Sequence, residues 1–127
     1  MIYAIDFDGT IVENEYPEIG PLIPRAKQLI QAIKEHGDTF ILWTCRVGDE
    51  LAEAVKFLED AGIPPDYVNE NTPGMIKAFG NDCRKVFADV YIDDRSWLVL
   101  GGEWYRKGSS QENIRTMVSL VRIGRPE

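Results

Sequence analysis

Three short apolar runs of strand length each stop at a polar residue, and amphipathic segments of helical length separate them. The runs and the residues that end them are 2–5 with Asp6, 39–43 with Thr44, and 88–92 with Asp93. Runs of this length that are rich in β-branched and aromatic residues predict buried strands. Strands that alternate with helices predict an α/β fold, with a parallel sheet, right-handed crossovers and helices on both faces.

Between these runs, apolar residues recur at helical spacing. One pattern begins after Pro24, which suits the first turn of a helix, and ends at Gly37. A second helix is predicted around residues 51–58 and ends before Gly62. Weaker signals predict a strand at Tyr67–Val68, a short helix from Pro73 to about Phe79, and a last helix over residues 114–121.

The bulk properties are those of one globular domain over residues 1–127. No run of about 18 apolar residues predicts a membrane span, and no N-terminal secretion signal is visible. The two cysteines are too few for a disulfide framework, so we expect free thiols and a cytoplasmic location. The formal net charge of -7 repels phosphate backbones and argues against nucleic acid as a partner.

Acidic residues gather where the predicted strands end. Asp6 and Asp8 follow the first strand, and Asp93 and Asp94 follow another. Ligands of open α/β sheets bind outside the carboxyl ends of the strands, so we expect these carboxylates to converge with Thr44. Four carboxylates repel one another unless a divalent cation or protons neutralise them. Mg²⁺ suits an all-oxygen site that shares ligands with a substrate phosphate, and this pattern therefore predicts a magnesium site.

Three motifs carry a resemblance to a known family: DFDGTIV at residues 6–12, Thr44 after a hydrophobic strand, and YIDD at residues 91–94. Together they resemble the haloacid dehalogenase (HAD) superfamily over roughly residues 2–100. The resemblance implies a HAD-like Rossmann sheet and a magnesium-dependent phosphohydrolase, an enzyme that cleaves phosphoric monoesters.

The resemblance also implies a role for each acidic residue. Asp6 would attack phosphorus and form an aspartyl-phosphate, while Asp8 would protonate the leaving group and then activate water. Mg²⁺ would be held by Asp6, by the backbone carbonyl of Asp8, and by the Asp93–Asp94 pair. We favour Asp94 as the direct ligand, with Asp93 behind it.

A phosphorylated substrate is expected to contact Gly9, Thr10, Thr44 and Arg46. Gly9 suits a tight turn that lets the backbone approach the phosphate. Thr44 would donate a hydrogen bond to a phosphoryl oxygen, as the resemblance implies. The guanidinium of Arg46 forks well onto phosphate, and Arg95 offers the same chemistry.

The superfamily further uses a lysine to neutralise the phosphoryl group, and two lysines compete for this role. Lys85 matches the position of the motif shortly before the last strand. Lys77 is favoured by geometry, because it lies near the start of a short helix that leaves the third strand.

The inserts in this chain are short. Only 13 residues separate Thr10 from Pro24, which is enough for a hairpin flap but not for a domain, and the stretch from Asn69 to Ala88 is similarly short. We therefore expect a member without a cap domain. A lid would then come from the flap over residues 11–23 or, in a homo-oligomer, from the 104–105 segment of a neighbouring subunit.

Two other functions stay open from the sequence. One is a phosphatase of polynucleotide ends or other macromolecules, suggested by the open site and by Arg46. The other is a non-catalytic protein of the same fold that binds phosphate or magnesium. Asp8 favours a phosphatase over a dehalogenase, because hydrolysis of a carbon–halogen bond does not need that acid.

Overall fold

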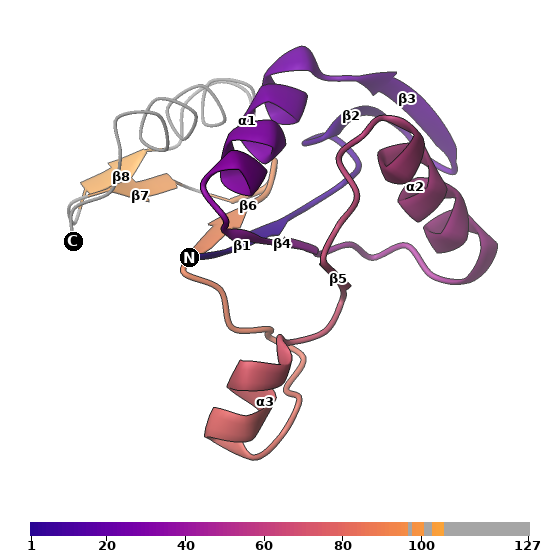
Figure 1. Cartoon of the computed structure of the whole chain (residues 1–127). Coiled ribbons are helices and arrows are strands. Elements are labelled where there is room, and N and C mark those ends of the chain that lie inside the picture. The colour runs from indigo at the N-terminus through magenta and orange to yellow at the C-terminus, as the bar shows by residue number, and fades with distance from the viewer. Residues whose placement is uncertain (97, 101–102, 106–127) are drawn as a thin grey trace.

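The computed structural model of the chain describes residues 1–96, 98–100 and 103–105 (Figure 1). Its centre is a four-stranded parallel sheet with the strand order β5–β4–β1–β6. The strands are β1 (Ile2–Ile5), β4 (Thr39–Leu42), β5 (Tyr67–Val68) and β6 (Val90–Ile92). A mixed α/β fold with a parallel sheet and flanking helices was expected from the sequence, and it is confirmed.

The register brings the carboxyl ends of the central strands to one edge of the sheet. Ile5 of β1 pairs with Leu42 of β4 and with Ile92 of β6. The next backbone amide of β1, that of Asp6, donates to the carbonyl of Ile92 at 2.9 Å. The polar residues that follow these strands therefore leave the sheet side by side.

One face of the sheet packs against two amphipathic helices, α1 (Pro24–Glu35) and α2 (Gly48–Asp60). Side chains alternate along β1, so Tyr3 and Ile5 point into this main core, whereas Ala4 points to the other face. The helices contribute a stripe of buried residues that recurs at helical spacing: Ala26, Leu29, Ile30, Ala32, Ile33, Ala54 and Leu58.

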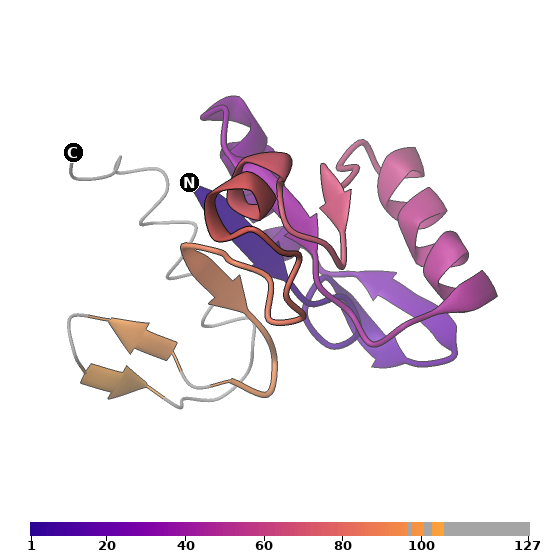
Figure 2. The same cartoon turned by 90° about the horizontal axis from the view of Figure 1, so that it is seen from below.

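The opposite face of the sheet has a smaller core. Ala4 and Ile41 pack there against Val86 and Ala88, which belong to the segment that leads into β6. Helix α3 (Pro73–Phe79) lies on the side of the sheet opposite α1 (Figure 1), and in Figure 2, which is seen from below, it lies in front of the sheet. None of its residues is buried, so α3 adds little to the core.

A buried asparagine closes the neck of the excursion that carries α3. Asn71 is 2% exposed, and its Oδ1 accepts from the backbone amide of Phe87 at 2.6 Å. Its Nδ2 donates to Asp82 Oδ1 at 2.8 Å and to the carbonyl of Cys83 at 3.0 Å. One side chain thus joins the outgoing and the returning backbone.

Residues 11–23 contain the expected hairpin, which we call the flap. It consists of β2 (Val12–Glu15) and β3 (Glu18–Leu22), which pair antiparallel. A second antiparallel pair, β7 (Leu98–Leu100) and β8 (Glu103–Tyr105), was not predicted. The helix predicted over residues 114–121 lies outside the described residues.

Two further observations concern the described residues. None of their helices has the length and apolarity needed to cross a membrane. Both cysteines, Cys45 and Cys83, are free and exposed.

Candidate functional site

A pocket of about 470 Å³ opens at the carboxyl edge of the sheet. Its walls come from the turn after β1, the flap, the segment after β4 and the turn after β6. The lining residues are Asp6, Asp8, Asn14, Tyr16, Thr44, Cys45, Arg46, Asp93, Asp94 and Arg95. The structure thus brings together all four expected aspartates and Thr44, although up to 88 positions separate them in the chain.

Asp6, Asp93 and Asp94 form a carboxylate cluster on one side of this pocket. One oxygen from each lies within 4.8 Å of the others. Asp6 and Asp93 are half-buried, and Asp94 is exposed. The backbone holds the Asp93 carboxylate in place, since the amide of Arg95 donates to Asp93 Oδ1 at 2.8 Å.

The carboxylate cluster disfavours full ionisation of its members. Burial raises the pKa of Asp6 to about 7, and the charges of Asp93 and Asp94 add to this rise. The hydroxyl of Thr10 donates to Asp6 Oδ2 at 3.2 Å and acts in the opposite direction. Partial burial, followed by the influence of Asp93, also raises the pKa of Asp94. The cluster therefore has unbalanced negative charge that a cation or protons can offset.

A magnesium ion fits the donor set of the carboxylate cluster. Mg²⁺ prefers oxygen ligands, and the cluster offers one carboxylate oxygen from each of three residues within 4.8 Å of one another. Asp6, Asp93 and Asp94 each offer one oxygen to such an ion, and the preference for Asp94 over Asp93 as the direct ligand stays a prediction. The part expected of the Asp8 carbonyl stays a prediction.

The turn after β1 needs a glycine at position 9. Gly9 has a φ of +85°, which L side chains rarely adopt, and a Cβ there would overlap the carboxylate of Asp94. Thr10 is fully buried, and its hydroxyl contacts Asp6. Thr10 therefore contacts Asp6 from a buried position. It was expected to contact the substrate, but it is not among the residues that line the pocket.

Asp8 lines the same pocket but is not part of the carboxylate cluster, and it has a very different environment. Arg46 Nε donates to Asp8 Oδ2 at 2.7 Å, and Nη2 donates to Asp8 Oδ1 at 2.7 Å. Both carboxylate oxygens are thus bonded in the bidentate geometry that guanidinium groups form with ionised carboxylates. The hydrogen bond to Asp8 raises the pKa of Arg46.

Arg46 is not offered to a substrate in the way we expected. Its side chain is 1% exposed, and its three remaining N–H groups donate to backbone carbonyls. The acceptors are the carbonyls of Pro17, Glu18 and Glu50, at 3.0, 2.9 and 3.4 Å. A guanidinium has five N–H donors, and all five are used within the protein. The correction has a simple cause, because the buried guanidinium must satisfy its donors internally.

Thr44 is held at the mouth of β4 by a residue that sequence reasoning missed. Asn69 Oδ1 accepts from the amide of Thr44 at 2.8 Å, and Asn69 Nδ2 donates to the carbonyl of Thr44 at 3.0 Å. Asn69 has a φ of +51°, a conformation that asparagine tolerates better than most residues. The hydroxyl of Thr44 accepts from the amide of Arg46 at 3.1 Å, which leaves the hydroxyl proton for an acceptor in the pocket.

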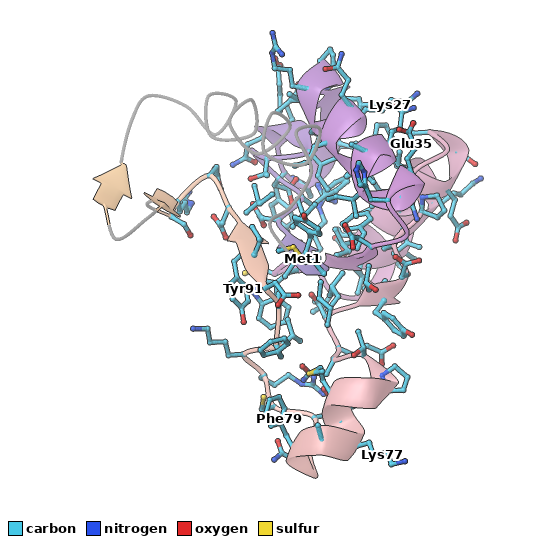
Figure 3. All side chains as sticks on the ribbon, turned by 60° about the vertical axis from the view of Figure 1, so that its left-hand side comes forward. Met1, Lys27, Glu35, Lys77, Phe79 and Tyr91 are labelled. Atoms are coloured by element: carbon cyan, nitrogen blue, oxygen red, sulfur yellow. The ribbon has the colours of Figure 1, made fainter. Side chains whose placement is uncertain are left out.

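The structure does not bring Lys85 or Lys77 to the pocket. Lys85 precedes β6, and its Nζ lies 5.4 Å from the ring centroid of Tyr91, whose hydroxyl reaches back to the carbonyl of Val86. Residues before a parallel strand emerge at the edge opposite to those after it, which separates Lys85 from Asp93. Lys77 is exposed on α3 and points away from the sheet (Figure 3). Among the described residues, the pocket is lined by two cationic side chains, Arg46 and Arg95.

The flap contributes two lining residues, Asn14 and Tyr16, that were not predicted. The length of the hairpin indicated a flap, but its sequence does not indicate which side chains turn toward the sheet. The backbone amide of Tyr16 donates to Asn14 Oδ1 at 3.2 Å, so the two residues form one turn at the rim of the pocket.

Comparisons with known proteins give one structural relative. No protein-family model matches the chain, and no curated protein matches it. A solved structure described as the conserved protein coded by a locus from Bacteroides thetaiotaomicron is 38% identical in sequence, with a TM-score of 0.67. The match covers 76% of this chain and 77% of that protein.

Proposed function

The chain belongs to the same family as this conserved Bacteroides thetaiotaomicron protein, and for this member we propose a magnesium-dependent phosphohydrolase activity of the HAD type. The reaction would pass through an aspartyl-phosphate on Asp6. One observation carries the proposal: Asp6 lies in a pocket beside Asp93 and Asp94, with Thr44 and Asp8 in the same lining. The residues that we propose as nucleophile, metal ligands, hydrogen-bond donor to phosphate and proton carrier thus line one pocket.

Asp6 is the nucleophile in this proposal. One of its carboxylate oxygens forms a bond to phosphorus while the bond between phosphorus and the ester oxygen breaks. The ester oxygen leaves with a proton from Asp8. Covalent catalysis of this kind divides a difficult displacement into two easier ones. Mg²⁺ held by the carboxylate cluster supplies positive charge that lets an anionic carboxylate approach an anionic phosphoryl group.

Asp8 returns as a base in the second step. A water oxygen bonds to phosphorus, the bond from phosphorus to Asp6 breaks, and Asp8 takes a proton from that water. The bidentate pair with Arg46 corresponds to Asp8 after it has lost its proton. Arg46 then acts as a positioning residue, because it fixes the carboxylate at the pocket between the two transfers.

Thr44 and Arg95 complete the site. The hydroxyl of Thr44 donates to a phosphoryl oxygen, and Asn69 keeps the backbone of Thr44 in place for this contact. With Lys85 and Lys77 elsewhere, Arg95 is the exposed cation of the described lining. We assign to it the charge that the superfamily draws from a lysine.

The test is hydrolysis of p-nitrophenyl phosphate by the full chain, with Mg²⁺ and with EDTA. We expect turnover that needs the metal. Acid-quenched samples should show a phosphoryl adduct on the peptide that contains Asp6 by mass spectrometry. Magnesium binding by calorimetry without any turnover would contradict the proposal and favour a protein that only binds magnesium or phosphate.

A further inference from the structure

Tyr16 is an exposed aromatic residue that is nevertheless fixed in place. It lies in the turn between β2 and β3, it is 59% exposed, and it lines the pocket. A tyrosine ring combines a large apolar surface with a polar hydroxyl, and such rings are enriched where proteins contact a partner. Because Tyr16 is both exposed and part of the pocket lining, it is a candidate contact for a bound ligand.

A stack of buried groups holds the ring. The guanidinium carbon of Arg46 lies 5.1 Å from the ring centroid of Tyr16 and 5.2 Å from that of Phe7, which is fully buried. Phe7 in turn packs edge-to-face on Phe57 of α2, with centroids 6.2 Å apart. Cation–π contacts of this kind are strongest when the cation is desolvated, as Arg46 is.

Arg46 also fixes the backbone of the same turn. Its Nη1 and Nη2 donate to the carbonyls of Pro17 and Glu18. The ring and the backbone that carries it are thus both attached to one buried side chain. A binding surface that is ordered before the ligand arrives loses less entropy on binding than a mobile one.

The pocket has room for more than a phosphoryl group. Its volume of about 470 Å³ falls within the range of about 300–1,000 Å³ that small-molecule sites occupy. The carboxylate cluster and Thr44 account for the phosphate end. The remainder extends to Asn14 and Tyr16, so the leaving group of the ester would lie against the flap.

We propose that Tyr16 is a stacking platform and that the substrate is a small phosphomonoester whose leaving group carries a planar aromatic or heterocyclic ring. This inference rests on the proposed function and adds a substrate class to it. One side of the Tyr16 ring packs on Arg46, and the exposed surface receives the planar ring of the leaving group. Aromatic rings attract one another in offset or edge-to-face geometry beyond the effect of buried area. Tyr16 is then a specificity-determining residue.

A matched pair of esters tests the platform. Benzyl phosphate and cyclohexylmethyl phosphate have similar leaving alcohols, but only the first has a planar ring. We expect the wild-type chain with Mg²⁺ to favour benzyl phosphate by about 5- to 10-fold in kcat/KM. Tyr16→Leu, which keeps an apolar cover over Arg46, should remove this preference through KM and leave kcat within about twofold. Tyr16→Phe should retain the preference.

The control variant is Phe79→Ala, which removes an aromatic side chain of similar exposure, 55%, from α3 (Figure 3). Phe79 does not line the pocket, so this change should not alter the preference between the two esters. A wild-type ratio near one, or an equal loss for both esters in Tyr16→Leu, would overturn the platform.

A binding experiment separates failure of the platform from failure of the proposed activity. Benzylphosphonate and cyclohexylmethylphosphonate cannot be hydrolysed at the phosphorus–carbon bond, and calorimetry with Mg²⁺ gives their affinities. Tighter binding of benzylphosphonate that is lost in Tyr16→Leu supports the platform even if neither ester is turned over. Equal affinities of the two phosphonates contradict the platform whatever the rate of hydrolysis.

Discussion

Asp6 and Asp8 leave the end of β1 two positions apart, yet their carboxylates lie in opposite environments. Asp8 accepts two short hydrogen bonds from a buried guanidinium, so its negative charge is fully paired. Asp6 has the Thr10 hydroxyl and two further carboxylates as neighbours, and its pKa is raised to about 7. The comparison indicates that the protein itself pairs the charge of Asp8 and leaves the charges of the carboxylate cluster unpaired.

The two environments suit different roles for Asp8 and for the carboxylate cluster. A carboxylate whose charge is paired by Arg46 has a fixed position, which suits a group that must meet a water or a leaving group at a defined place. Repulsion among the charges of the carboxylate cluster destabilises the folded state, and a divalent cation can reduce this repulsion. Removing the partner of Asp8 should therefore lower stability, whereas removing a carboxylate from the cluster should raise it.

The largest expected effect is on activity in Asp6→Asn. The amide is neither a nucleophile nor an anionic metal ligand, so phosphatase activity should fall by more than about 10³-fold. The rate of p-nitrophenyl phosphate hydrolysis measures this loss. The control Asp60→Asn removes an exposed carboxylate from α2 and should leave the rate unchanged. Residual activity within tenfold of wild type would contradict the assignment of Asp6 as the nucleophile.

Arg46→Met removes the ion pair between Arg46 and Asp8. The substitution leaves the Asp8 carboxylate, 17% exposed, without its cation, and it also removes three hydrogen bonds to backbone carbonyls. We expect a loss of about 2–4 kcal/mol in the free energy of unfolding, measured by urea denaturation. Asp8→Asn combined with Arg46→Met should recover part of this loss. If the double variant were as unstable as the sum of the single ones, the pair would not be coupled.

The raised pKa of Asp6 predicts an unusual dependence of stability on pH. The pKa of Asp6 is about 7 in the folded state against an ordinary value of 3.8, so between these pH values the folded chain holds a proton that the unfolded chain has lost. Without metal, the free energy of unfolding should therefore fall as pH rises from about 4 to about 7, by about 1–3 kcal/mol.

Denaturation in EDTA across this pH range measures the effect, and Asp6→Asn is its control. The asparagine variant should show a flatter profile and a higher stability at neutral pH than the metal-free wild type. Added Mg²⁺ should restore the wild-type stability above pH 7. A wild-type stability that rises through this range would show that the carboxylate cluster is not strained by its charges.

The smallest effects are expected at the two lysines. Lys77→Met and Lys85→Met should each change kcat/KM by less than about twofold, because neither side chain lines the pocket. Arg95→Met should lower it by about tenfold or more, since a cation that offsets developing charge on phosphate is removed. A large loss in either lysine variant would mean that α3 or the segment before β6 moves to the pocket during turnover.

Much of the fold follows from local patterns. α1 begins at Pro24 and ends before Gly37, and the short helix from Pro73 to Phe79 is present as predicted. β6 begins two residues later than expected, at Val90, and side chains supply the reason. The amide of Ala88 donates to the hydroxyl of Tyr91 instead of to a neighbouring strand. Such a bond is set by tertiary contacts and has no signature in the apolar pattern.

Only the site residues that directly follow a strand were predictable. The ends of the predicted strands indicate Asp6, Thr44 and Asp93, because a parallel sheet places these residues at one edge. The inward turn of Arg46 toward Asp8 depends on a contact between residues 38 positions apart, which no periodicity reports. The contribution of the flap likewise depends on how the hairpin folds over the sheet.

The neck closed by Asn71 has a consequence for engineering. Its hydrogen bonds to Phe87, Asp82 and Cys83 keep the two ends of the excursion together independently of α3, which buries no residue. Loop closure costs little more when a closed loop grows longer, and exposed tips of this kind tolerate insertions. The tip of α3 around Gly80, which is not among the residues that line the pocket, is therefore a site at which a reporter or a tether can be grafted.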